Sequence, residues 1–171
     1  MLEDPGFDHA ELAAALLTAY GIEASTFTFI PAYDPHAASY QAAGPAGSWF
    51  LKVHRQAVGG PHLEVPRALR DAGIANVLAP IRTQASTLWH ELDDGRGLVL
   101  YPFVAGRNAI RDGLTADQWR TFGTALQAVH DSDLADRFSG RLSTETFALP
   151  SAAVVRSVME LAAAPPLVSP A

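Results

Sequence analysis

The residues best placed to do chemistry are one lysine and one strand-like segment further along the chain. Lys52, the only lysine in the sequence, lies within the apolar run 49–53. A lysine held on a rigid strand is a point charge that can bind phosphate oxygens. Residues 98–106 form a second, strongly apolar run that breaks at Pro102 and Gly106. Because backbone groups past such a break are free to hydrogen bond a base, the two runs together predict a nucleotide cleft.

The composition limits the class of protein. The chain has 171 residues, of which 49% are hydrophobic and 18% charged, as expected for one globular domain with a core. A net charge of -6 argues against a nucleic acid partner, because phosphate backbones require clustered Lys and Arg. The absence of cysteine excludes disulfides, thiolate metal sites and a cysteine nucleophile. Without a membrane-length apolar run or a signal pattern, we expect a cytoplasmic protein with no membrane partner.

A helix is well signalled near the start of the chain. Asp8 is a suitable N-cap, and Glu11, three residues on, would complete a capping box. Apolar residues at helical spacing follow as far as Tyr20, and Gly21 is a natural C-terminal stop. The pattern predicts a helix over residues 8–20.

Strands should follow this helix and hold the lysine. Residues 26–30 are rich in β-branched and aromatic types, and residues 38–42 form a short return strand after a turn. A glycine-containing turn then leads into the strand of Lys52. Alternation along that strand puts Lys52 on one face with Phe50 and His54. The opposite face carries the more apolar side chains of Trp49, Leu51 and Val53.

The middle of the chain predicts a helix, a short strand and a hairpin. The helix begins at residue 63 or 65 and ends at residue 72, and Pro66 is tolerated only in its first turn. Residues 77–81 predict a short strand. Two strand-like runs, 86–92 and 98–104, flank a strong hairpin turn. Short turns between strands imply a mostly antiparallel sheet with a helix packed on it.

Helices dominate the C-terminal part. Thr115 is an N-cap with Gln118 as its capping-box partner, and a last helix spans residues 152–163. An apolar stripe follows the first of these helices, formed by Trp119, Phe122, Leu126 and Val129.

Short motifs follow one another in an order that a known family shares. They are residues 27–53, Val65-Pro66, Gly73-Ile74, residues 77–80, Leu88-Trp89, residues 100–106, Gln118-Trp119, Phe122-Gly123 and Leu126. This order resembles that of the aminoglycoside phosphotransferases, and most of all the spectinomycin phosphotransferase-like branch of that kinase-like group. The resemblance covers residues 10–147.

The resemblance implies an α+β fold with a protein-kinase-like N-terminal lobe. That lobe would hold an antiparallel sheet of about five strands plus a helix, followed by a few C-terminal-lobe helices. We expect the lobe and its hinge in residues 1–106, and part of the C-terminal lobe with an extended tail in residues 107–171. The implied cofactor is ATP, with Mg expected for the family. The implied acceptor is an aminocyclitol or aminoglycoside.

Within the resemblance, Lys52 matches the lysine that pairs with the α- and β-phosphates of ATP. The alternative is a lysine that snorkels from a strand edge. Glu64 is the candidate for the glutamate that orients this lysine. Because Pro66 pushes Glu64 towards the helix start, Glu64 could instead serve as a favourable charge at the helix N-terminus.

The hinge residues Tyr101, Phe103 and Val104 would offer backbone groups and apolar walls to adenine. The alternative is an ordinary buried strand. The loop expected to cover the phosphates, residues 31–39, contains no glycine, so a glycine-rich phosphate cradle is absent.

The residues that move a phosphate are not found in the sequence. The family carries a His-x-Asp loop, an Asn five residues beyond that Asp and a later Asp. The nearest similar segment begins at His130, and the position five after Asp133 is Phe138. We therefore assign no catalytic residue and no metal ligand, and expect a truncated phosphotransferase that is inactive alone. The alternative is a non-catalytic nucleotide- or partner-binding module from a truncated or split gene, which could form a homodimer through Val155 and Met159.

Overall fold

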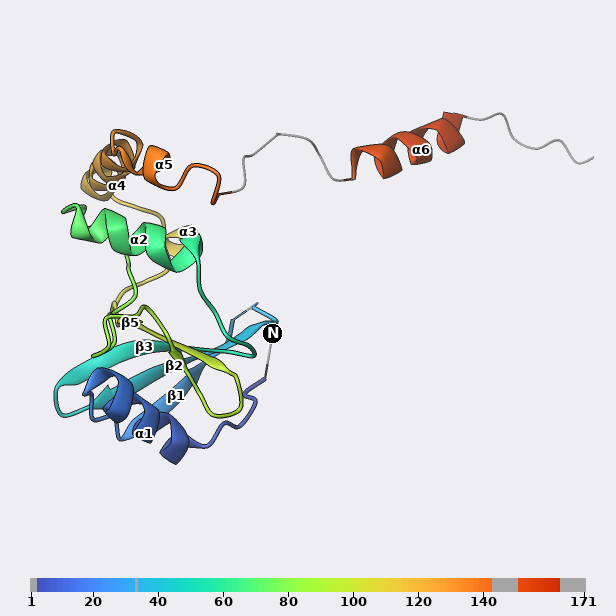
Figure 1. Ribbon diagram of the computed structural model, residues 1–171. Coiled ribbons are helices and arrows are strands. Elements are labelled where there is room, and N and C mark those ends of the chain that lie inside the picture. The colour runs from blue at the N-terminus through green and yellow to red at the C-terminus, as the bar shows by residue number, and fades with distance from the viewer. Residues whose placement is uncertain (1–2, 33, 143–150, 164–171) are drawn as a thin grey trace, which may run out of the picture. The chain divides into compact units, whose positions relative to one another are not determined.

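The computed structural model describes residues 3–32, 34–142 and 151–163. The chain divides into two compact units, Met1–Ser139 and Gly140–Ala171 (Figure 1). The first unit contains the sheet and the segment after it, and the described part of the second contains one helix, α6 (Ala152–Ala163). This helix has the predicted bounds. The predicted extended tail, residues 165–171, lies outside the described residues.

Five strands form one antiparallel sheet in the order β1-β2-β3-β5-β4. They are β1 Thr26–Ile30, β2 Ala37–Gly44, β3 Gly47–His54, β4 His90–Glu91 and β5 Gly97–Pro102. The central strand, β3, places Lys52 opposite Ser39 of β2 and Val99 of β5. The predicted α+β fold with a five-stranded antiparallel sheet is confirmed.

Helix α1 (His9–Tyr20) covers one face of this sheet (Figure 1). Its apolar face forms a core with the inward side chains of the three central strands. The fully buried members of this core are Leu12, Leu16, Tyr40, Ala42, Leu51, Val53, Leu98 and Leu100. The predicted alternation along β3 is therefore correct, because Leu51 and Val53 are buried in this core while Lys52 faces the other way.

The ends of α1 agree with the sequence signals except at Glu11. The Asp8 carboxylate accepts a hydrogen bond from the Ala10 N–H at 2.8 Å, and Gly21 adopts a left-handed conformation with φ 68°. Glu11 was predicted to complete a capping box, but its two carboxylate oxygens bind Arg96 at 2.8 Å. A guanidinium provides two charge-assisted hydrogen bonds to a carboxylate, which a single backbone N–H does not match.

Helix α2 (Pro61–Asp71) begins earlier than predicted and contains Pro66 in its interior. Pro61 lies in the first turn, where a missing N–H costs nothing, and it sets the start of the helix. The prediction that Pro66 requires a first-turn position was therefore wrong. Packing compensates for its missing hydrogen bond. A second hydrophobic cluster packs against α2. Its buried residues are Ala68 and Leu69 of α2, Leu134 of α5 (Leu134–Arg137) and Phe138.

The predicted strand over residues 77–81 is a loop in the structure. Ile81 donates one backbone hydrogen bond to the Leu100 carbonyl of β5 at 2.7 Å, but Pro80 has no N–H to extend a ladder. The predicted strand 86–92 is also shorter, since only β4 pairs with β5. A turn precedes it, in which the Thr83 N–H bonds the Thr87 carbonyl and Ser86 has φ 65°.

The segment after the sheet contains α3 (Ala109–Asp112) and α4 (Ala116–His130). The predicted capping box of α4 is confirmed, because Thr115 and Gln118 bond each other's backbone N–H groups. No residue of α4 is buried, although its apolar stripe follows the predicted spacing. None of the helices in the described part of the chain has the length and apolar content needed to cross a bilayer.

Candidate functional site

The candidate site lies on the sheet face opposite α1. Phe50, Lys52 and His54 point to this face from β3, and Tyr101 joins them from β5, where it pairs with Phe50. The rings of Phe50 and Tyr101 lie 6.3 Å apart. The Lys52 side chain is 27% exposed, so it is neither sealed in the core nor free in solvent. The face therefore presents one ammonium group between aromatic side chains and a histidine.

Asp34 holds the ammonium group of Lys52. Its Oδ2 atom lies 2.7 Å from Lys52 Nζ, and its Oδ1 atom accepts a hydrogen bond from the His36 N–H at 2.9 Å. The hydrogen bond from Lys52, followed by the one from His36, lowers the pKa of Asp34. Sequence reasoning placed Asp34 only within the loop 31–39 that is expected to cover the phosphates, and gave it no role of its own. Its role follows from the β2–β3 register, which pairs Ser39 with Lys52 and brings the preceding loop to the lysine.

His54 lies two residues beyond Lys52 on the same face. Burial lowers the pKa of His54, and the charge of Lys52 lowers it further, while Asp34 opposes the shift. The Nε2 atom of His54 is buried, and it has no hydrogen-bond partner among the described residues. The site is therefore built around one ion pair and a partly buried imidazole that is harder to protonate than an exposed one.

The predicted hinge follows β5 at the edge of this face. Tyr101 is half-buried, and burial raises its pKa. The strand ends at Pro102, so the backbone groups of Phe103 and Val104 lie outside the β ladder. Phe103 is partly buried, whereas the Val104 side chain is 71% exposed. The segment thus combines backbone groups outside the sheet with apolar side chains.

Glu64 lies in the first turn of α2 and is partly buried. In the structure the Asp34 carboxylate binds Lys52. The pairing of Glu64 with Lys52 stays a prediction.

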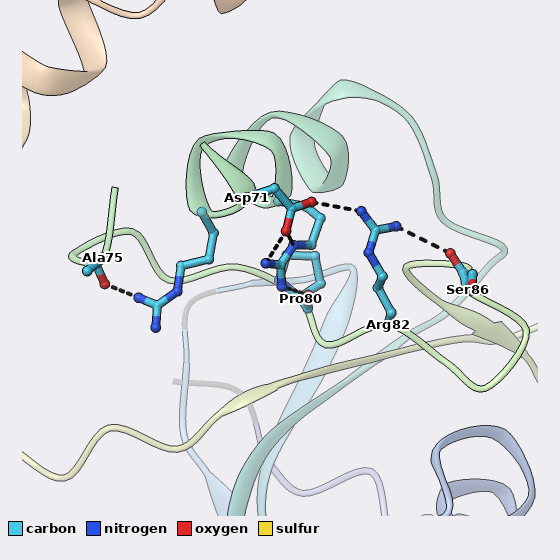
Figure 2. A network of polar contacts seen from close by, with 7 residues as sticks. Asp71, Ala75, Pro80, Arg82 and Ser86 are labelled. Carbon is cyan, nitrogen blue, oxygen red and sulfur yellow. Dashed lines mark hydrogen bonds and ion pairs between the residues drawn. The ribbon is translucent and has the colours of Figure 1, made fainter. Parts of the chain in front are cut away.

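A polar network anchors α2 to the loop that follows it (Figure 2). The Asp71 carboxylate binds Arg67 of the same helix at 2.5 Å and Arg82 of the loop at 2.8 Å. Arg82 also donates to the Ser86 carbonyl at 3.4 Å. The two guanidinium groups lower the pKa of Asp71.

The same loop is fastened to the sheet and to α1. Besides the bond from Ile81 to β5, the Gln84 N–H donates to the Ala19 carbonyl of α1 at 2.8 Å. The helix carrying Glu64 is thus linked through Asp71, Arg82 and this loop to α1 and to β5, the strand that leads into the hinge. Sequence spacing could have found only the Arg67–Asp71 pair, which is four residues apart on one helix.

The segment most similar to a catalytic loop has structural roles. His130 ends α4, and the Asp131 N–H caps this helix by bonding the Gln127 carbonyl at 2.8 Å. Phe138, at the position where the family has an Asn, is 2% exposed and belongs to the core shared with α2. No group of three or more His, Asp or Glu side chains that could hold a metal ion occurs among the residues with a described placement.

Two solved structures match this fold over nearly the whole chain. Both are of spectinomycin phosphotransferase APH(9)-Ia. The complex with ADP and spectinomycin matches 91% of this chain with a TM-score of 0.77 and 28% identity. The AMP-bound complex matches 92% with a TM-score of 0.75 and 26% identity. This chain covers 47% and 48% of those chains, and so spans about half their length.

No protein-family model and no curated protein matches the sequence. The structural match nevertheless confirms the resemblance to the spectinomycin phosphotransferase branch that the order of motifs predicted. It also confirms the kinase-like N-terminal lobe, because the sheet and helices fit the corresponding part of that phosphotransferase. The chain thus has the fold of the half of a small-molecule kinase that it matches.

Proposed function

We propose that this chain provides the nucleotide-binding part of an ATP-dependent phosphotransferase whose acceptor is an aminocyclitol or an aminoglycoside. The position of Lys52 carries the proposal, since the only lysine lies on the central strand and faces the side that ends in the hinge. The similar solved protein was crystallised with ADP and with spectinomycin, which supports both the nucleotide and the acceptor class.

In this proposal each predicted residue has a physical role. Lys52 attracts the α- and β-phosphates, as a positive charge on a rigid strand does. Tyr101 and Phe103 form part of the wall for adenine, and Val104 is exposed until a base covers it. Glu64 would orient the lysine from α2. Magnesium ligands and the base for the acceptor hydroxyl would have to come from residues outside those assigned here.

Nucleotide titration by calorimetry tests the proposal. ADP should bind the wild-type chain, and Lys52→Met should weaken ADP at least about tenfold, because a desolvated charge-assisted contact is lost. Adenosine, which has no phosphate, should bind both proteins equally. Arg120→Met is the control, because Arg120 is an exposed cation on α4. A wild-type chain without measurable ADP affinity, or equal ADP affinity in Lys52→Met, would contradict the proposal.

We further propose that this chain alone does not turn over ATP, because no group in it is assigned to position the acceptor hydroxyl. Release of ADP should be measured at high protein concentration with and without an aminocyclitol antibiotic. Robust antibiotic-dependent release would show that catalytic residues are present and were missed.

An exposed apolar face favours a second candidate function, a module that binds a protein partner. Phe122 of α4 is 54% exposed, and Trp119 and Leu126 beside it are also exposed. Phe122 and Leu126 line a groove of about 550 Å³ together with Leu114 and Val129. Apolar patches of this kind often mark interfaces. The partner in this second candidate is another copy of the chain, with Val155 and Met159 of α6 as further exposed contacts.

Light scattering distinguishes this candidate from the first. A concentration-dependent dimer that Phe122→Lys abolishes would support the partner-binding module. A monomer at every accessible concentration would remove it. The comparison should be made with and without ADP, because nucleotide binding and self-association are independent outcomes.

A further inference from the structure

We propose that Asp34 determines how strongly the site prefers phosphorylated ligands over unphosphorylated ones, because it competes with phosphate for Lys52. The inference rests on the proposed nucleotide function. In the ligand-free chain the carboxylate already holds one of the three N–H donors of the ammonium group. A phosphate that approaches Lys52 therefore meets the negative charge of Asp34 as a competitor for the ammonium group, whereas adenosine does not.

The geometry of the pair supports direct competition. Asp34 and Lys52 are 30% and 27% exposed, so a solvent-borne anion can reach both partners. The distance of 2.7 Å between Oδ2 and Nζ is that of a charge-assisted hydrogen bond. The loop around Asp34 has no glycine, so its backbone has less freedom to approach a phosphate closely, and its side chains become the groups that matter.

A second basic side chain borders the same cavity as Asp34 and could bind its carboxylate when the contact with Lys52 is broken. Asp34 lines a cavity of about 400 Å³ together with Arg55, which follows β3 directly. Arg55 makes no ion pair within the described part of the chain. A guanidinium that borders the same cavity can receive a displaced carboxylate, which lowers the cost of releasing the lysine. The ligand-bound arrangement would therefore pair Asp34 with Arg55 and the phosphate with Lys52.

The direct test uses Asp34→Asn, which removes the charge and keeps the turn. An asparagine Oδ1 can still accept the hydrogen bond from the His36 N–H, so the loop should retain its shape. Calorimetry should show ADP binding tightened about tenfold and adenosine binding changed by less than about twofold, because only the phosphate meets the competitor.

Asp94→Asn is a matched control. Asp94 also combines a turn bond, from the Arg96 N–H at 3.1 Å, with an ion pair to the Arg96 side chain. It lies between β4 and β5 and does not contact Lys52 among the contacts of the described residues. ADP affinity should be unchanged in this variant. Thermal unfolding by circular dichroism verifies that both variants are folded.

A second variant tests where the carboxylate goes. Arg55→Gln should weaken ADP about threefold in the wild-type background, because the displaced carboxylate loses its new partner. The same substitution should have no effect on ADP in the Asp34→Asn background. This non-additivity, measured as a double-mutant cycle, is the signature of a contact that forms only in the bound state.

The outcomes separate this inference from the proposed function. If no variant binds ADP, the proposed function fails and the role of Asp34 fails with it. If ADP binds the wild type and Lys52→Met loses it, but Asp34→Asn binds no tighter, the nucleotide site stands and the competition is refuted. Tighter ADP binding in Asp34→Asn, with adenosine and the Asp94→Asn control unchanged, supports the inference.

Discussion

Helices α1 and α4 have the same sequence signals and opposite surroundings. Both begin at a side-chain cap and both carry an apolar stripe at helical spacing. Leu12 and Leu16 of α1 are fully buried against the sheet, whereas no residue of α4 is buried. Local sequence thus determines that a helix forms, but a partner surface determines whether its apolar face contributes to stability.

The difference also separates two kinds of functional surface. Helix α1 and the sheet enclose a buried hydrophobic core. This core holds the opposite face of the sheet, which carries Lys52, in a fixed geometry. The exposed stripe of α4 is a surface that binding could still bury. The three predictions that follow compare these regions, from the largest expected effect to the smallest.

The largest expected contrast is between two truncations of apolar side chains. Leu16→Ala should lower the free energy of unfolding by about 2–5 kcal/mol, because it leaves a cavity in the core between α1 and the sheet. Phe122→Ala in α4 should lower it by less than about 1 kcal/mol, because the ring already contacts solvent. Urea unfolding followed by circular dichroism measures both. Equal losses would mean that α4 is covered in solution.

Sequence reasoning succeeded where the structural cause is local. The Asp8 and Thr115 caps and the left-handed Gly21 act within one turn, so α1 and α4 were predictable at these ends. Alternation likewise fixed the face of Lys52, because neighbouring side chains on a strand point to opposite sides. These parts of the fold needed no knowledge of distant contacts.

The parts that failed depend on residues far apart in the chain. Glu11 binds Arg96, which is 85 residues away, instead of completing the predicted capping box. Pro66 is accommodated because the cluster with Leu134 and Phe138 stabilises α2 from outside the helix. The Asp34 contact with Lys52 joins a loop to a strand 18 residues further on, so no spacing rule for helices or strands predicts it.

The second prediction concerns the anchor between α2 and the following loop. Asp71→Asn should lower the free energy of unfolding by about 1 kcal/mol, because two guanidinium groups lose their common carboxylate at a partly exposed site. Hydrogen exchange should rise in α2 more than in α1. The control is Asp117→Asn on α4, whose pair with Arg120 is highly exposed and should contribute almost nothing. An unchanged exchange rate in α2 would show that packing alone holds that helix.

The smallest effect is a pH dependence that belongs to His54. Burial first, and then the charge of Lys52, lower the pKa of His54 below its ordinary value of 6.5. At pH values between the lowered pKa of the folded chain and 6.5, the unfolded chain binds a proton more readily than the folded chain does. The contribution of His54 to stability is therefore fully present above pH 6.5, and it is lost as the pH falls through 6.5 towards the lower folded value.

Urea unfolding of the wild type and of His54→Gln at several pH values between 5 and 8 tests this dependence. The wild type should lose stability on acidification, and His54→Gln should lose less, because glutamine takes up no proton. The result would locate the proton uptake on the sheet face that holds Lys52. An identical pH dependence in His54→Gln and the wild type would assign it to another group and weaken the picture of a rigid, partly buried lysine face.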